Sequence, residues 1–184
     1  MSDTATRQIR LAGTGGQGLG LAGRLLADAC VAAGHAVAQS QTYEPTSRGG
    51  SSRSDLVVAD GTVDYPLVTA LDALLLLDQA ALEDAPALLR EGALVVTDAA
   101  LVPHPPAAQG ELHALPLTAR ARELGNPRVA NMVGLGALVG LAGWPAFEQV
   151  ERAVETSTPA RFRELNLAAL RAGRALVATD ASAA

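Results

Sequence analysis

A glycine-rich segment at residues 13–20, GTGGQGLG, has the composition of an anion-binding loop. Its glycines match the spacing G-x-G-x-x-G, and backbone N–H groups in such a loop can hold a phosphate where a strand passes into a helix. No Lys-Ser or Lys-Thr pair follows the loop, which argues against a P-loop. Either the loop binds an anion without a lysine, or its glycines only permit a tight turn. The candidate contacts in this loop are Gly13, Gly15, Gly16, Gln17 and Gly18.

A second polar segment, YEPTSRGGSSRSD at residues 43–55, combines an aromatic residue with arginines, glycines and serines. Arg48 can present two parallel N–H groups to a phosphate or a carboxylate, and the glycines beside it allow close backbone approach. The alternative is a surface turn in which Arg48 pairs with Asp55. We predict that this loop lies beside the glycine loop and contacts a ligand or a subunit. Its candidate contacts are Tyr43, Arg48, Gly49 and Gly50.

Other chemistries have little support in the sequence. A dinucleotide site normally has an acidic residue about 20 residues after its glycine loop, at the end of the second strand, but no acid precedes Glu44 in that region. The three histidines have no partners at the spacing of a hydrolytic triad. One cysteine, Cys30, cannot form an internal disulfide or supply a zinc site or an iron–sulfur cluster. We therefore propose no catalytic residue and no metal ligand in this chain.

Alternating strand and helix patterns must position the two loops. Strands are predicted at residues 9–13, 35–43, 54–60, 72–78, 92–98 and 111–115. Helices are predicted directly after the glycine loop and at residues 79–90, 117–124, 129–141 and 146–154, with a last helix from Pro159. Asp78 and Thr158 are the expected N-caps of the helices that follow them.

The order of these elements predicts a single three-layer α/β/α Rossmann-like domain over residues 1–184, with a core at about 8–177. Its sheet should be mostly parallel and its C-terminal part helical. The apolar face expected for the last helix is Phe162, Leu165, Ala169, Gly173 and Leu176. Glycines 134, 136 and 140 on the preceding apolar helix suggest close contact with another backbone, either in a subunit or in the core of this chain.

Composition excludes several classes of partner. The net charge is −5 and the 14 basic residues are scattered arginines, so we expect no nucleic acid partner. The longest apolar run, residues 132–144, is 13 residues against the roughly 20 that a membrane span needs. We expect a soluble, cytoplasmic protein without membrane contact.

In order along the chain, five segments resemble the gamma subunit of the 2-oxoacid:ferredoxin oxidoreductases. They are IRLAGTGGQGLGLAGRLLADAC, QTYEPTSRGGSSRSDLVVAD, VDYP, GALVVTDAALVP and ELGNPRVANMVGLGALVGLAG. The resemblance implies a complex that converts a 2-oxoacid and coenzyme A to an acyl-CoA and CO2, with electrons passing to ferredoxin. It also implies that alpha and beta subunits, with a small ferredoxin-like subunit as a further candidate, hold thiamine diphosphate, Mg²⁺ and the iron–sulfur clusters. This chain would take part in coenzyme A binding.

The second loop bears on the substrate, because it departs from the family pattern Y-G-P-E-x-R-G-G at Glu44 and Thr46. RGGSSRS together with VDYP is most similar to the 2-oxoglutarate members, with branched-chain oxoacids next and pyruvate as a further alternative. Two other hypotheses remain at this stage. The chain could be an independent dinucleotide-binding oxidoreductase, or a purely structural subunit.

Overall fold

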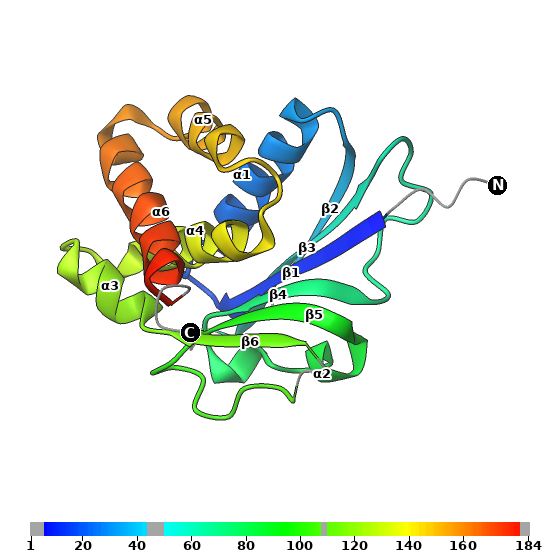
Figure 1. Ribbon diagram of the computed structural model, residues 1–184, viewed down its shortest axis with the longest axis horizontal. Helices are drawn as coiled ribbons and strands as arrows, with labels where there is room; N and C mark the ends of the chain where they lie inside the picture. The colour runs from blue at the N-terminus through cyan, green and yellow to red at the C-terminus, as the bar shows by residue number, and fades with distance from the viewer. Residues whose placement is uncertain (1–5, 44–49, 108–109, 181–184) are drawn as a thin grey trace.

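A computed structural model describes residues 6–43, 50–107 and 110–180 of the chain. Its centre is a six-stranded sheet with the strand order β2-β3-β1-β4-β5-β6 (Figure 1). The strands are β1 Thr6–Thr14, β2 Ala36–Tyr43, β3 Ser51–Ala59, β4 Leu71–Leu76, β5 Leu89–Asp98 and β6 Glu111–Leu115. All six predicted strands are confirmed, with ends that differ by a few residues.

The direction of each strand determines which strand ends lie on the same side of the sheet. β1, β4, β5 and β6 are parallel, whereas β3 is antiparallel to both of its neighbours, β1 and β2. Because two reversals restore the direction, β2 runs the same way as β1, and the mostly parallel sheet is confirmed. The carboxyl ends of β1 and β2 therefore lie on the same side, which we call the rim.

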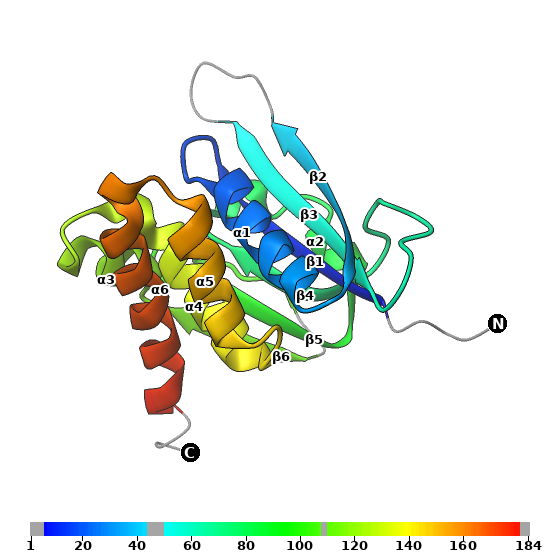
Figure 2. The same ribbon diagram turned by 90° about the horizontal axis from the view of Figure 1, so that it is seen from above.

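Most helices cover one face of the sheet (Figures 1 and 2). They are α1 Leu19–Ala32, α3 Leu117–Glu123, α4 Ala130–Ala142, α5 Phe147–Ser157 and α6 Ala160–Asp180. The larger core lies between these helices and the sheet. On the other face a smaller cluster is covered by the turn η1 (Gln79–Ala81) and the short helix α2 (Ala85–Leu88), so this third layer is thin.

The prediction of one continuous helix at residues 79–90 is wrong. Asp78 does cap a helical turn by accepting a hydrogen bond from the Ala80 N–H, at 2.9 Å, but that turn is η1. Glu83 then has a positive φ of 34°, which a continuing helix cannot accommodate. Leu89, assigned to the helix by periodicity, pairs with Leu71 of β4 and begins β5.

The prediction for the start and face of the last helix also needs correction. The Thr158 hydroxyl is buried and has no hydrogen-bond partner among the described residues, so it does not cap the first turn of α6. Phe162 is 45% exposed, but the other predicted residues lie on the buried side of α6: Ala169 and Gly173 are buried, and Leu165 and Leu176 are partly buried against the core. The predicted face is therefore confirmed except at Phe162, which lies in the first turn of the helix, and it also includes the buried Leu170 and Val177.

Close packing of α4 against α6 explains the glycines on the apolar helix. A Cβ atom on Gly136 would lie 1.9 Å from the Leu170 carbonyl oxygen, and one on Gly173 would lie 1.9 Å from the Val133 carbonyl oxygen. The two backbones touch, as expected for a tight core helix. The neighbouring backbone belongs to this chain.

Cys30 on α1 is completely buried, and burial raises the pKa of its thiol to about 12, although the positive charge of Arg7 acts in the opposite direction. The thiolate is the nucleophile, so at pH 8 the folded protein should react with iodoacetamide on the order of 100-fold or more slowly than the urea-unfolded protein. Mass spectrometry of the alkylated fraction over time measures both rates. Equal rates would contradict the buried position.

Candidate functional site

The glycine loop is a short, internally bonded turn between β1 and α1. Gln17 Oε1 accepts a hydrogen bond from the Thr14 N–H at 2.7 Å. A Cβ on Gly13 would lie 2.2 Å from that oxygen, so glycine is required for this contact. Gly18, at φ 74°, is the left-handed N-cap of α1. The Gln17 side chain therefore holds the loop in shape.

A hydrogen bond joins this loop to the start of β3. The Gly15 N–H donates to the Gly50 carbonyl oxygen at 3.0 Å, and Thr14 pairs with Ser51 in the β1–β3 ladder. The prediction that the two loops lie side by side is thus confirmed at Gly15 and Gly50. Tyr43 ends β2 opposite Ser52. The predicted contacts Arg48 and Gly49 lie outside the described residues.

Asn131 on α4 fixes the start of α1, although the sequence did not single it out. Its Nδ2 donates to the Gly18 carbonyl oxygen at 2.9 Å, and its Oδ1 accepts from the Met132 N–H at 2.9 Å. A Cβ on Gly18 would lie 2.6 Å from Asn131 Nδ2. A buried polar residue in the apolar stretch ANMVGLGALVG was the available signal.

A cavity of about 210 Å³ opens beside the loop on the rim. The backbone N–H groups of Gly16 and Gly18 have no hydrogen-bond partner among the described residues. Arg128 is the charged residue of the lining; its side chain is exposed and pairs with no carboxylate in the part of the chain that the structure describes. The lining residues are Gly16, Gln17, Leu101, Thr118, Pro127, Arg128 and Ala130.

Asp98 shapes the far wall of this cavity from the carboxyl end of β5. It is fully buried, and its carboxylate accepts hydrogen bonds from the N–H groups of Ala100, Leu101 and Thr118, at 2.9, 3.1 and 2.7 Å. These bonds anchor the turn after β5 and the start of α3 on one carboxylate. Asp98 therefore positions these two segments, because its carboxylate oxygens accept hydrogen bonds from their backbone N–H groups.

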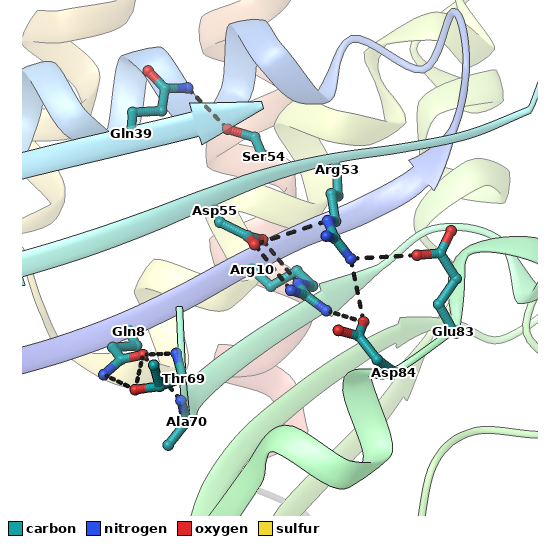
Figure 3. Close-up of polar contacts among 10 residues, drawn as sticks. All are labelled: Gln8, Arg10, Gln39, Arg53, Ser54, Asp55, Thr69, Ala70, Glu83 and Asp84. Carbon is teal, nitrogen blue, oxygen red and sulfur yellow. Dashed lines mark hydrogen bonds and ion pairs between the residues drawn. The ribbon is translucent and has the colours of Figure 1, made fainter. Parts of the chain in front are cut away.

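The alternative pairing of Arg48 with Asp55 falls on a residue outside the described ranges, and within them Asp55 binds Arg10 (Figure 3). Arg10 Nε and Nη2 donate to the two Asp55 oxygens at 2.8 and 2.9 Å, and Nη1 donates to Asp84 at 2.6 Å. Burial lowers the pKa of Arg10, but Asp55 and Asp84 outweigh it and the net shift is upward. Arg53 extends the network to Asp84, at 3.2 Å.

The network lies on the thin side of the sheet and is built from adjacent strands. Arg10 and Asp55 are opposite each other in the β1–β3 ladder. Nearby, Gln8 Oε1 accepts hydrogen bonds from the Thr69 and Ala70 N–H groups (Figure 3). An arginine within the otherwise apolar run IRLAG, at residues 9–13, was the signal in the sequence. These residues stabilise the sheet beneath the second loop.

The histidines and acids form no arrangement for hydrolysis or metal binding in the described ranges. His35 Nδ1 lies 2.6 Å from Asp60, and its Nε2 accepts from Trp144 Nε1 at 3.3 Å, which ties the end of α1 to the segment after α4. Within residues 6–43, 50–107 and 110–180, no group of three or more His, Cys, Asp or Glu side chains is placed to bind a metal ion. No helix in those ranges is long and apolar enough to cross a membrane.

Comparison with known proteins gives a consistent result. The family model for pyruvate ferredoxin/flavodoxin oxidoreductase matches residues 8–176. The 2-oxoglutarate synthase subunit KorC of Methanocaldococcus jannaschii is 37% identical, with 91% of each chain covered. The crystal structure of the keto/oxoacid ferredoxin oxidoreductase gamma subunit from Geobacter sulfurreducens superposes with a TM-score of 0.85 at 38% identity, covering 95% of this chain and 98% of that one.

A third similarity concerns the fold alone. A 2-oxoglutarate:ferredoxin oxidoreductase chain from Magnetococcus marinus, with 2-oxoglutarate, coenzyme A and succinyl-CoA bound in its structure, superposes with a TM-score of 0.83 at 23% identity. The match covers 96% of this chain and 32% of that one. The fold thus also occurs as one part of a longer chain.

Proposed function

Because this chain belongs to the pyruvate ferredoxin/flavodoxin oxidoreductase family, we propose that it is the gamma subunit of a 2-oxoglutarate:ferredoxin oxidoreductase and that its rim contacts coenzyme A. The complex oxidises a 2-oxoacid, joins the acyl group to coenzyme A, releases CO2 and passes two electrons to ferredoxin. The KorC relatives support 2-oxoglutarate as the substrate. We treat residues 1–184 as a single domain that is inactive alone.

Thiamine diphosphate supplies the carbanion chemistry of such a complex when it is bound, and iron–sulfur clusters carry the electrons. The donor set of this chain does not fit either kind of centre. Its one cysteine is buried with a raised thiol pKa, and the described residues offer no metal-binding cluster. We therefore assign thiamine diphosphate, Mg²⁺ and the clusters to alpha and beta subunits and to a small ferredoxin-like subunit, with ferredoxin as electron acceptor.

The observation that carries the coenzyme A proposal is the cavity beside the joined loops. Its lining combines the Arg128 guanidinium, which pairs with no carboxylate among the described residues, with Gly16, whose N–H has no partner there, and both can donate hydrogen bonds to a phosphate oxygen. The N–H of Gly18, in the same loop but outside the lining, is a third donor without a partner in the described ranges. Coenzyme A is a large polyanion, so a rim with several donors and no competing carboxylate in the cavity lining suits its phosphates. These residues would bind and orient coenzyme A while partner subunits perform the chemistry.

Arg128→Ala in the assembled complex is expected to raise the KM for coenzyme A about tenfold, the effect of losing about 1.4 kcal/mol of binding. The value of kcat and the KM for 2-oxoglutarate should stay within about twofold, because the arginine makes no contact with the 2-oxoacid in this proposal. Steady-state reduction of a viologen dye, with coenzyme A varied, measures these parameters.

Arg122→Ala is the matched control, because Arg122 is an exposed arginine on α3 outside the cavity lining. Arg128→Lys should recover part of the affinity, because it restores the charge without the planar fork. Arg48→Ala and Gly15→Asp test the two loops in the same assay. Unchanged coenzyme A affinity in all of these variants would leave the chain as a purely structural subunit.

A further inference from the structure

The two edges of the sheet differ in how they are protected. β6, at one edge, is a five-residue strand that carries Glu111 and His113. β2, at the other edge, is an eight-residue strand with the sequence AVAQSQTY, which contains no charged residue and no proline. Its register with β3 runs without a bulge from Ala36 opposite Ala59 to Tyr43 opposite Ser52.

An edge strand of this kind is unusual on an isolated protein. Proteins shield exposed edges with charges, prolines, bulges or short strands, because unpaired N–H and C=O groups attract other strands. β2 has none of these features, and within the described residues no further strand pairs with it. Figure 2 shows no helix and no further strand along the outer side of β2. Its edge therefore has the properties of a surface that another chain covers.

The two faces of β2 leave room for an added strand. Gln39 and Gln41 point toward α1: Gln39 bonds to the Ser54 hydroxyl at 2.8 Å, and a Cβ on Gly20 of α1 would lie 2.9 Å from Gln41 Oε1. The alternate residues, Ala38 and Ser40, face the thin side and are only half-buried. Small side chains on that face would not obstruct a neighbouring strand.

We propose that a β-strand of a partner subunit pairs with β2 and extends the sheet of this chain, a form of β-augmentation. The inference rests on the proposed function, which requires partner subunits at the rim. β2 ends at Tyr43, where the second loop begins, so the edge is continuous with that rim. A partner strand here would bring its subunit next to the coenzyme A site.

Hydrogen–deuterium exchange of the chain alone and in the complex with its thiamine-diphosphate and iron–sulfur partner subunits tests the pairing directly. In the isolated chain about half of the β2 amides should exchange quickly, because alternate N–H groups of an antiparallel pair face away from β3. In the complex these fast amides should exchange at least tenfold more slowly. The amides of β6 should not change.

Ala38→Lys tests the same edge by mutation. Ala38 lies opposite Val57 on the thin side, and the lysine stem can cover apolar surface while its ammonium reaches water in the isolated chain. The charge should weaken assembly with the partner subunits at least tenfold, measured by titration on an immobilised chain. Leu112→Lys on β6 is the control, since Leu112 is 41% exposed on the other edge strand, and it should assemble normally.

The outcomes separate this inference from the proposed function. Normal assembly of the wild-type chain with β2 amides that stay fast would overturn the β2 interface alone. Amides of β2 that are already slow in the isolated monomer would also overturn it, because another segment of this chain then covers the edge. An isolated chain that forms a dimer, which Ala38→Lys disrupts, would overturn it too, because a second copy then covers the edge. A wild-type chain that binds none of the partner subunits would overturn the proposed function itself.

Discussion

Asp55→Asn is expected to lower the free energy of unfolding by about 3 kcal/mol, the lower end of the range for breaking a buried ion pair. The substitution removes the charge that balances the Arg10 guanidinium, which is 3% exposed. Asp84 keeps its contact with Arg10 at 2.6 Å and limits the loss. Urea denaturation followed by circular dichroism measures the change.

Two further variants decide whether the buried charge is the cause. Asp84→Asn should cost less than about 1 kcal/mol, because the Asp84 side chain is 52% exposed and water screens its charge. The double variant Arg10→Met/Asp55→Leu removes both charges and should recover most of the stability lost by Asp55→Asn. A double variant that is as unstable as the single one would show that packing, and not charge, determines the effect.

Gly136→Ala should destabilise the protein by about 3 kcal/mol, since overpacking a tight contact typically costs 1–3 kcal/mol and here the obstacle is backbone. The new Cβ would lie 1.9 Å from the Leu170 carbonyl oxygen, so α4 and α6 must move apart. Gly173→Ala creates the reciprocal clash with Val133 and should cost a similar amount. Thermal and urea unfolding of both variants measure these costs.

Coupling between the two glycines provides a sharper test. Once the helices have separated for one methyl group, the second should fit with little further cost, so the double variant should be far less destabilised than the sum of the singles. Gly140→Ala is the control on the same helix. Its Cβ would meet the Val177 side chain at 3.0 Å, which can shift, so its stability should remain within about 1 kcal/mol of wild type. Additive losses at residues 136 and 173 would contradict the shared contact.

The sequence determined the strands and the family of this protein. Alternating apolar runs bounded by glycines and acids predicted all six strands, because periodicity and turn chemistry are local properties. The glycine loop was recognised from its spacing, and its place between β1 and α1 is confirmed. Similarity over nearly the whole chain identified the family before any geometry was known, and residues 8–176 match its model.

Tertiary contacts decided the rest. The Arg10–Asp55 pair and the anchoring of Gly18 by Asn131 join residues that are 45 or more positions apart, which no local pattern reveals. The antiparallel insertion of β3 between β1 and β2 likewise depends on the pairing of β1 with a strand that is not its neighbour in the sequence. The predicted helix at 79–90 was wrong because Leu89 pairs with β4 and belongs to a strand, although the spacing of the apolar residues around it is that of a helix. Arg128 likewise lies beside the glycine loop through tertiary contacts, since the hydrogen bond from Asn131 to Gly18 holds the start of α4 against that loop.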